Sequence, residues 1–491
     1  MFLGIDLGTS GVKAILADED DRIVGQANRP LEVSRPRPLW SEQDPGAWWA
    51  ATDAAVAALR ERWPEALAAV SGIGLSGQMH GATFLDASDA VLRPAILWND
   101  GRSGAACDEL ERRVPTVRET TGNLVMPGFT APKLLWLAEH EPEVAQRVHR
   151  VLLPKDYLRL LLTGEHASEM SDASGTLWLD VGERKWSPAL VEATGLSLAA
   201  MPRLYEGNQP TGELRSELAT RWGLGPGVVI AGGAGDQAAG AAGAGIVGAG
   251  QGFLALGTSG VYFVAGDRFA PNPARAVHAF CHCLPGRWHQ MSVSLSAASC
   301  LSWVSRLVRA ENEAAALSLA EAALGESGLS SAVPCFLPYL SGERTPHNDP
   351  HARGVFFGLT HDTGPGQVVL SVLEGVAFAL ADGQEALLAG GAPIEAVSLI
   401  GGGARSDLWG RLLASALDRP LTRSGGAEVG PALGAARLGR LAATGEAPDT
   451  VCKAPPVERV LEVDPALRDA LGARREQFAG LYPALRGLFS R

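Results

Sequence analysis

The sequence contains little cysteine and no excess of basic residues. Its six cysteines are spread over 491 residues and follow no disulfide spacing, which is typical of a reducing compartment. Lysine and arginine together number 42 against 54 aspartates and glutamates, so the net charge is −12 and the chain lacks the basic surface that a nucleic-acid backbone requires. The N-terminus offers neither a basic segment nor a small-residue cleavage site, and Asp6 interrupts its first apolar stretch. We therefore expect a cytoplasmic protein without a nucleic-acid partner.

One stretch poor in polar side chains is long enough to cross a membrane. From Ala238 to Leu256 the only strongly polar side chain is Gln251. Glycine recurs throughout this stretch, and each glycine costs about 1 kcal/mol in a helix interior. We therefore expect a close-packed small-residue helix that runs into a buried strand, and no membrane partner.

Three common signatures are missing or stand in the wrong context. The motif G-x-x-x-x-G-K-[ST] does not occur, which excludes a P-loop. G-x-G-x-x-G is matched at Gly72 to Gly77 and at Gly243 to Gly248, but neither match follows a strand and opens a clear helix. The cluster Cys281-His282-Cys283 has no second pair of ligands at zinc spacing, so buried structural thiols are the better interpretation.

A hexapeptide, Leu-Gly-Thr-Ser-Gly-Val, occurs twice, about half a chain length apart. The copies lie at Leu7 to Val12 and at Leu256 to Val261, and apolar strand-like runs flank each one. This pattern predicts two β-hairpins with glycine-rich turns, the first followed by a third strand near Arg22 to Ala27. A chain of this length is expected to form two domains, and the repeat assigns one hairpin to each.

The repeated Gly-Thr-Ser-Gly turn has a chemical use. Glycine allows a close backbone approach, and consecutive N–H groups with two hydroxyls form a concave nest for phosphate oxygens. An ordinary hairpin turn explains a single copy as well, but the duplication favours two phosphate-facing hairpins across a cleft. Asp6 precedes the first turn whereas Ala255 precedes the second, so only one half offers a carboxylate. Mg²⁺ takes one or two carboxylates and keeps its waters.

Two further glycine-rich junctions follow apolar strands. The run Val228 to Ala231 enters a glycine bend and ends on Asp236 at the start of the small-residue helix. Asp236 is either a second functional carboxylate or a helix cap. The run Ser398 to Ile400 enters three glycines before another helix, and such a junction suits an adenosine site.

The order of these motifs resembles the FGGY carbohydrate kinases, members of the actin-like ATPase superfamily. The resemblance rests on Gly4 to Ser10, Gly235 to Gln237, Leu256 to Gly260, Gly401 to Ala404, Thr130 to Leu137 and Gly354 to Glu374. It implies an α/β fold with two ribonuclease-H-like domains and a central cleft for ATP and sugar. The implied division is an N-terminal FGGY domain over residues 1–245 and a C-terminal FGGY domain over residues 246–491, whose helical tail from Asp464 carries no recognisable chemistry.

Other stretches are similar to the branch of this family that phosphorylates a small ketose. They are Ser34 to Asp44, Gly77 to Ala82, Leu97 to Arg102, Thr121 to Leu124, Pro154 to Tyr157 and Leu340 to His347. This similarity implies transfer of the γ-phosphoryl group of ATP to D-xylulose with Mg²⁺. One departure is Gln237, where that branch carries asparagine, and it leaves the sugar contact at this position open.

The resemblance also implies individual roles. Asp236 would be the general base, Asp6 would organise Mg²⁺, and Met79 and His80 would recognise the sugar, although a histidine in such a place is more often a core residue. Asp100 and Gln237 would be further hydroxyl partners. The residues that would bind ATP are Thr9, Ser10, Lys13, Gly257 and Thr258 at the phosphates and Gly402 and Gly403 at the adenosine.

Two alternatives remain open from the sequence. A sister kinase for another ketose, a polyol or an aldonate would keep the ATP motifs and differ at Met79, His80 and Asp100. An actin-like fold could also serve as a nucleotide-binding regulator without transfer activity, although Asp236 beside a sugar-type loop argues against this. A homodimer is compatible with either interpretation.

Overall fold

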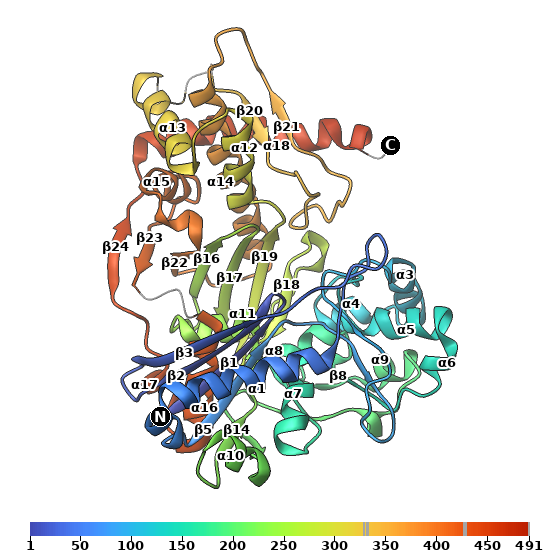
Figure 1. Ribbon diagram of the computed structural model, residues 1–491. Coiled ribbons are helices and arrows are strands. Elements are labelled where there is room, and N and C mark those ends of the chain that lie inside the picture. The colour runs from blue at the N-terminus through green and yellow to red at the C-terminus, as the bar shows by residue number, and fades with distance from the viewer. Residues whose placement is uncertain (328, 330–332, 426–429, 490–491) are drawn as a thin grey trace.

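Two seven-stranded sheets form the two halves of the molecule in the computed structural model (Figure 1), which describes residues 1–327, 329, 333–425 and 430–489. The first sheet has the order β13-β14-β5-β1-β2-β3, with β15 also paired to β5. Its strands are β1 (Phe2–Gly8), β2 (Gly11–Ala17), β3 (Ile23–Pro30), β5 (Gly72–Gly77), β13 (Pro210–Glu213), β14 (Val229–Ala231) and β15 (Ala234–Gly235). The second has the order β18-β19-β17-β16-β22-β23-β24. Its strands are β16 (Gln251–Leu256), β17 (Gly260–Gly266), β18 (His278–Cys281), β19 (Trp288–Ser294), β22 (Ala396–Ile400), β23 (Leu421–Ser424) and β24 (Val457–Leu461).

The two sheets repeat one topology, as the duplicated hexapeptide predicts. In each half a β-hairpin continues into a third antiparallel strand, and its first strand also pairs in parallel with a later strand. The tight turns fall where the repeats lie, because Gly8 pairs with Gly11 and Leu256 pairs with Gly260. The expected third strand is β3. The mixed α/β fold with two related sheets is therefore confirmed.

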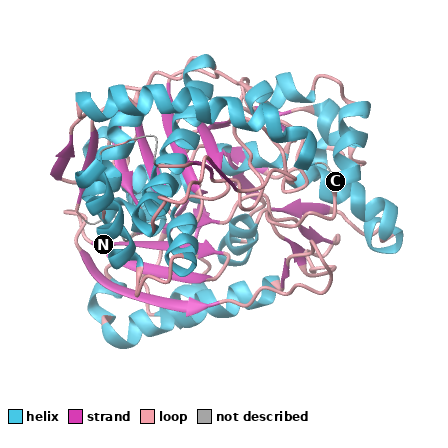
Figure 2. Cartoon of the chain, turned by 90° about the horizontal axis from the view of Figure 1, so that it is seen from above, coloured by secondary structure: helices cyan, strands magenta, loops and turns pink. Residues whose placement is uncertain are grey.

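Helices cover the sheets on both sides (Figure 2). In the first half α1 (Pro45–Arg62) contacts β2 and β3, and its N-terminus is capped by the Asp44 carboxylate, which accepts from Gly46 N. In the second half the core is built on α14 (Pro365–Ala389), which contacts α12 (Ala298–Leu307), α13 (Glu313–Ser327) and α15 (Asp407–Ala416). By length and composition α14 could cross a membrane, but 78% of its apolar window is buried inside the protein, as in a core helix.

One helix crosses from the second half of the sequence to the first sheet. Helix α16 (Gly430–Thr444) contacts β1, β5, β14 and α11 (Asp236–Gly243), and Figure 1 shows it among the N-terminal strands. The approach is close because glycines line it. A Cβ at Gly74 would lie 1.8 Å from the Ala435 carbonyl oxygen, and one at Gly434 would lie 1.8 Å from that of Ala239. The proposed boundary between residues 245 and 246 separates the two sheets, whereas α16 joins the first sheet from beyond it.

The expected helix from Ala238 into a strand is shorter than its apolar run. Helix α11 ends at Gly243 and β16 begins at Gln251. Gly245 and Gly250 have positive φ angles of 70° and 82° and turn the chain between them, which ends the helix. The Cys281-His282-Cys283 cluster is buried, and among the residues that the structure describes no group of three or more His, Cys, Asp or Glu could hold a metal ion.

Candidate active site

The two repeated turns present their tips to solvent. Ser10 and Thr258 are exposed, while the strands behind them are buried. In the second turn the Thr258 carbonyl oxygen accepts from Ala297 N at 2.9 Å and from Ser299 Oγ at 2.7 Å, which fixes the backbone and leaves the Thr258 side chain outside. In the first hairpin Lys13 pairs across the strands with Asp6. Each turn is a rigid support for an accessible hydroxyl.

The proposed adenosine junction lies beside the second turn. Strand β22 runs parallel to β16, and Gly402 begins the short 3₁₀ helix Gly402–Arg405 directly after it. A Cβ at Gly403 would lie 2.6 Å from Leu256 Cδ2, so this junction contacts the strand that ends at Gly257 and Thr258. The structure therefore brings together the four residues of the C-terminal half that are expected to bind ATP, namely Gly257, Thr258, Gly402 and Gly403.

Asp6 and Asp236 both lie near the C-terminal ends of strands in the first sheet. Asp6 lies near the end of β1, and Asp236 opens α11 directly after β15, which pairs with β5 beside β1. Burial raises the pKa of Asp236, the charge of Asp6 raises it further, and the pKa of Asp236 reaches about 7. Asp236 Oδ1 accepts from Gln237 N at 2.8 Å, so Gln237 lies against this carboxylate.

The surroundings of Asp6 fit a divalent cation. Burial raises the pKa of Asp6, and Ser76 and Lys13 partly offset this. Asp6 Oδ1 is buried and accepts no hydrogen bond within the described chain, an arrangement that costs free energy unless a cation neutralises it. One carboxylate with a second one nearby is a donor set that Mg²⁺ accepts, since it keeps most of its waters.

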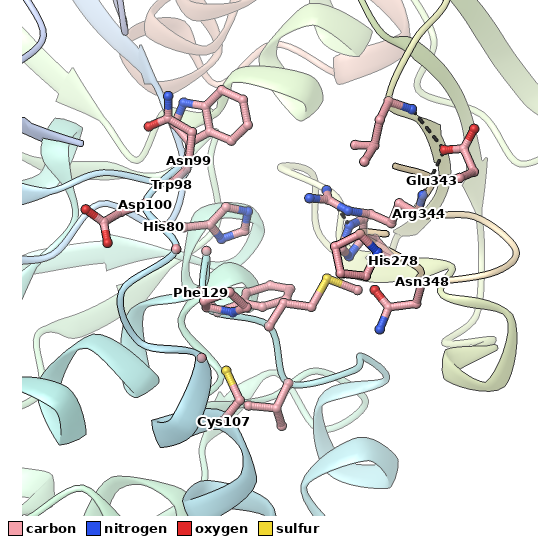
Figure 3. Close-up of a pocket in the computed structure, with 18 of the residues that line it drawn as sticks. His80, Trp98, Asn99, Asp100, Cys107, Phe129, His278, Glu343, Arg344 and Asn348 are labelled. Carbon is pink, nitrogen blue, oxygen red and sulfur yellow. Dashed lines mark hydrogen bonds between the residues drawn. The ribbon is translucent and has the colours of Figure 1, made fainter. Parts of the chain in front are cut away.

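A cavity of about 550 Å³ lies between the two halves of the chain (Figure 3). His80 and Trp98 approach it from the N-terminal half, and His278, Arg344 and Asn348 from the C-terminal half. Its volume suits a small ligand of a few polar groups. Residues from both halves therefore line one cavity.

His80 is held in a strained backbone conformation inside this cavity. Its φ is 67°, a value that costs a non-glycine residue about 1 kcal/mol or more. Its carbonyl oxygen accepts from Lys133 Nζ at 2.7 Å and from Thr130 Oγ1 at 3.1 Å, contacts that hold this conformation. Burial lowers the pKa of His80 to about 3, so the ring is neutral. Nδ1 lies 2.7 Å from the Gly175 carbonyl oxygen and must carry the proton, which leaves Nε2 as a hydrogen-bond acceptor.

The other expected sugar residues lie in different surroundings. Met79 is buried and lies against the residue before Asp236: a Cβ at Gly235 would lie 2.8 Å from Met79 Cγ. Asp100 lines the cavity, but its carboxylate points away from His278 and Arg344 in Figure 3. Both of its oxygens accept from Arg102, and Oδ2 also accepts from Ser41 N at 2.6 Å. A hydroxyl contact of Asp100 with a sugar stays a prediction, and it would compete with this ion pair.

Sequence reasoning missed the C-terminal wall of the cavity. His278 Nδ1 lies 3.1 Å from Asn123 Oδ1, and its Nε2 lies 3.4 Å from Arg344 Nη1. Burial lowers the pKa of His278 well below its usual range, so the neutral ring donates to Asn123 and accepts from Arg344. This chain orients a guanidinium beside the cavity. The segment Leu340 to His347 carried a family resemblance, but nothing local in it indicated that Arg344 would meet His278.

A hydrogen-bonded chain links the cavity to the first glycine-rich turn. Trp98 Nε1 donates to Thr9 Oγ1 at 2.9 Å, and Thr9 Oγ1 donates to Gln78 Oε1 at 2.9 Å. Gln43 Nε2 donates to the Thr9 carbonyl oxygen at 2.7 Å. Thr9 therefore contacts Trp98, which lines the cavity, and Gln78, which directly precedes Met79.

Two glycine-rich hairpin turns, a carboxylate pair and a cavity between two related halves of the chain are the features expected of a sugar kinase. Family models agree: the N-terminal domain of the FGGY family of carbohydrate kinases matches residues 1–243, and the C-terminal domain matches residues 252–443. The chain therefore belongs to the FGGY family of carbohydrate kinases, as its motifs predicted, and ATP binding is implied by the family.

Three relatives are similar to this chain over nearly its whole length. The xylulose kinase of Escherichia coli (strain K12) is 54% identical over 487 residues, which are 99% of both chains. The xylulose kinase of Klebsiella pneumoniae is 52% identical over the whole of both chains. The crystal structure of a "xyloylose kinase" from Brucella ovis superimposes with a TM-score of 0.95 at 51% identity and covers 99% of both chains.

Proposed function

We propose that this enzyme transfers the γ-phosphoryl group of ATP to D-xylulose and releases D-xylulose 5-phosphate and ADP. The choice of sugar is supported by the full-length similarity to kinases named for xylulose. The choice of reaction is supported by one observation above all. Asp236, a partly buried carboxylate with a pKa of about 7, follows Gly235, which contacts Met79 at the expected sugar loop, and it lies within electrostatic reach of Asp6.

In the proposed reaction Asp236 accepts the proton of the attacking hydroxyl. The hydroxyl oxygen forms a bond to the γ-phosphorus while the bond between that phosphorus and the β,γ-bridging oxygen breaks, and ADP leaves. Phosphoryl transfer needs mainly positioning and charge neutralisation, with one base near the hydroxyl. A base with a pKa near 7 suits this role, because it is available at neutral pH and still binds a proton well.

The remaining residues hold the substrates. Thr9, Ser10 and Lys13 contact the β- and γ-phosphates from one half, and Gly257 and Thr258 from the other. Gly402 and Gly403 line the adenosine. Asp6 would hold Mg²⁺, which when bound supplies positive charge against the phosphate oxygens.

The sugar lies in the cavity between the two halves. His80 accepts from a sugar hydroxyl through Nε2, and Met79, Asp100 and Gln237 complete the N-terminal contacts. Arg344 donates from the C-terminal side, held by His278. We place the enzyme in the cytoplasm and in xylose metabolism, without a nucleic-acid or membrane partner, and a homodimer is compatible with this assignment.

The proposal is tested by ADP release, coupled to a spectrophotometric assay, with D-xylulose, D-ribulose, glycerol and gluconate as acceptors. We expect kcat/KM to be at least about tenfold higher for D-xylulose than for any other acceptor, and activity to vanish when Mg²⁺ is chelated. A higher kcat/KM for another acceptor would assign the enzyme to a sister kinase. ADP release that no acceptor stimulates would favour a nucleotide-binding regulator.

A further inference from the structure

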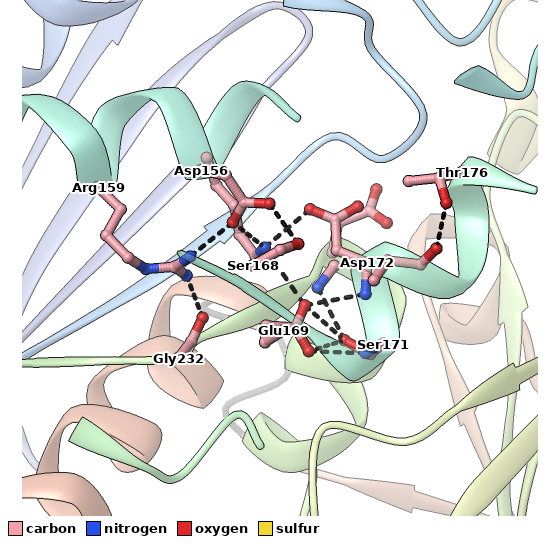
Figure 4. Close-up of polar contacts among 12 residues, drawn as sticks. Asp156, Arg159, Ser168, Glu169, Ser171, Asp172, Thr176 and Gly232 are labelled. Carbon is pink, nitrogen blue, oxygen red and sulfur yellow. Dashed lines mark hydrogen bonds and ion pairs between the residues drawn. The ribbon is translucent and has the colours of Figure 1, made fainter. Parts of the chain in front are cut away.

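A cluster of buried charged and polar residues contacts the bend from Gly232 to Gly235 that precedes Asp236 (Figure 4). Its members come from α7 (Pro154–Thr163), β9 (Ala167–Glu169) and α8 (Met170–Ala173). Each is at most 1% exposed. We call them the support cluster; its members are Lys155, Asp156, Arg159, Ser168, Glu169, Ser171 and Asp172.

The support cluster is held together by ion pairs. Lys155 Nζ lies 2.8 Å from Asp156 Oδ1, 2.9 Å from Asp172 Oδ2 and 3.3 Å from Glu169 Oε1. Arg159 Nη1 lies 2.7 Å from Asp156 Oδ1. Burying so many charges is costly, and a well-packed apolar replacement is often as stable or more stable. Stability alone is therefore a weak reason for this cluster.

Two of its members contact the backbone of the bend. Arg159 Nη2 donates to the Gly232 carbonyl oxygen, and Ser171 Oγ accepts from Gly235 N at 3.1 Å. The Ser171 hydroxyl donates its only proton to the Glu169 carboxylate, whose Oε2 lies 2.8 Å away. A lone pair of Oγ is thereby turned towards Gly235. Glu169 in turn is held by Lys155.

Apart from these two side chains, only backbone groups are seen to hold the bend: Gly232 N donates to the Gln209 carbonyl oxygen at 2.8 Å, Gly233 N donates to that of Gly207 at 2.9 Å, and β15 pairs with β5. Three of the residues from Gly232 to Gly235 are glycines, which offer only backbone groups for contacts. Gly233 has a φ of 73°, and a Cβ there would lie 2.2 Å from the Leu75 carbonyl oxygen. The bend is thus wedged against the first sheet, and hydrogen bonds to its backbone determine where the next residue, Asp236, lies.

We propose that the support cluster positions the carboxylate of Asp236, with Ser171 and Arg159 as positioning residues that fix the two ends of the Gly232–Gly235 bend. This inference rests on the proposed role of Asp236 as the base. A displacement of about 1 Å in a catalytic group can lower the rate about 10²-fold, so the loss of one such contact is felt in turnover more than in binding.

The test compares Ser171→Ala with Ser415→Ala. Ser415 lies in α15, outside the support cluster. It is buried like Ser171, and its hydroxyl accepts from Asp464 N at 3.1 Å, the same length as the contact of Ser171 with Gly235 N. We expect kcat with D-xylulose to fall at least about tenfold in Ser171→Ala while KM for ATP and sugar changes less than about threefold. Ser415→Ala should keep kcat within about threefold at a similar loss of melting temperature. Equal losses of kcat in both variants would overturn the proposal.

A second measurement uses the Asp236→Asn background. Because Ser171 acts through Asp236, adding Ser171→Ala to Asp236→Asn should not lower the residual rate further. The same fold-loss in both backgrounds would contradict the proposal. If Asp236→Asn alone keeps the wild-type kcat, the proposed base is wrong, whatever Ser171→Ala does. Should Ser171→Ala not fold, Ser171→Cys keeps the side-chain volume, supplies only a weak acceptor and is held to the same expectations.

Discussion

Asp236 and Asp6 share one partly buried region, and their charges oppose each other. The proton that Asp236 binds near neutral pH relieves both its burial and its repulsion from Asp6. A cation at Asp6 would remove part of this repulsion and favour the ionised base. In the proposed mechanism, a cation bound at Asp6 would therefore lower the pKa of Asp236 and favour the ionised carboxylate that accepts the proton.

Replacing Asp236 with asparagine separates a catalytic role from a structural one. Gly235 is the N-cap of α11 and Asp236 is its first residue, and the asparagine amide oxygen can still accept from Gln237 N. As the loss of a general base, Asp236→Asn should lower kcat about 10²–10⁴-fold with little change in ATP binding. Steady-state kinetics and nucleotide titration measure both quantities. A kcat near the wild-type value would make Asp236 a structural residue.

The raised pKa of Asp236 predicts a pH-dependent stability. The folded state binds the Asp236 proton more tightly than the unfolded state, so this contribution to stability is present at low pH and is lost as the pH rises towards about 7. The asparagine side chain at position 236 carries no charge. We therefore expect the Asp236→Asn variant to melt at a higher temperature than the wild type at pH 8, and the difference in melting temperature to be smaller at pH 5. Thermal melts at the two pH values check this, and an equal offset at both would contradict the assigned pKa.

At the scale of single residues, short motifs predicted positions but not contacts. Asp6 and Asp236 could be predicted because Asp6 precedes a glycine-rich turn and Asp236 follows a glycine bend. The ion pair that occupies Asp100 was not, because Arg102 is two residues away and its direction depends on the fold. Arg344, His278 and Asn123 come from three distant segments, and only tertiary packing joins them.

At the scale of elements, the close backbone contact between α16 and the first sheet is expected to contribute to the stability of the fold. Gly74→Ala would place its Cβ 1.8 Å from a carbonyl oxygen of α16, where no side chain can yield. We expect it to lower the free energy of unfolding by about 3 kcal/mol or more. Gly472→Ala is the control. Gly472 lies inside α18 (Pro465–Phe489), and a Cβ there would have nothing within 4 Å. We expect this variant to raise the free energy of unfolding by about 0.5–1 kcal/mol.

Urea unfolding of both variants measures the difference. A Gly74→Ala variant as stable as the wild type would mean that α16 can move away from the sheet without cost.

The hairpins β1–β2 and β16–β17 could be predicted from their repeated sequence because a hairpin is a local structure. The position of α16 could not, since its partners lie hundreds of residues away and its small residues fit several kinds of helix contact.

For the whole molecule, the position of Thr9 and Thr258 on different sheets predicts closure. If both turns bind one triphosphate, ligands should draw the two halves together. We expect a smaller radius of gyration in solution scattering with an ATP analogue, D-xylulose and Mg²⁺ than without ligands. The sugar alone serves as the control. An unchanged radius under saturating ligands would argue against a two-sided phosphate site.

The return of α16 to the first sheet also matters for how the protein is made. The strands β1 and β5 leave the ribosome early, but the helix that covers them is complete only at Thr444. At about 5–20 residues per second, synthesis of the roughly 200 residues after β15 takes about 10–40 s. During that interval the nascent N-terminal half lacks α16, and the apolar face of the sheet that this helix covers stays exposed. We expect residues 1–245 alone to aggregate, and the growing chain to need chaperone protection until the second half has been translated.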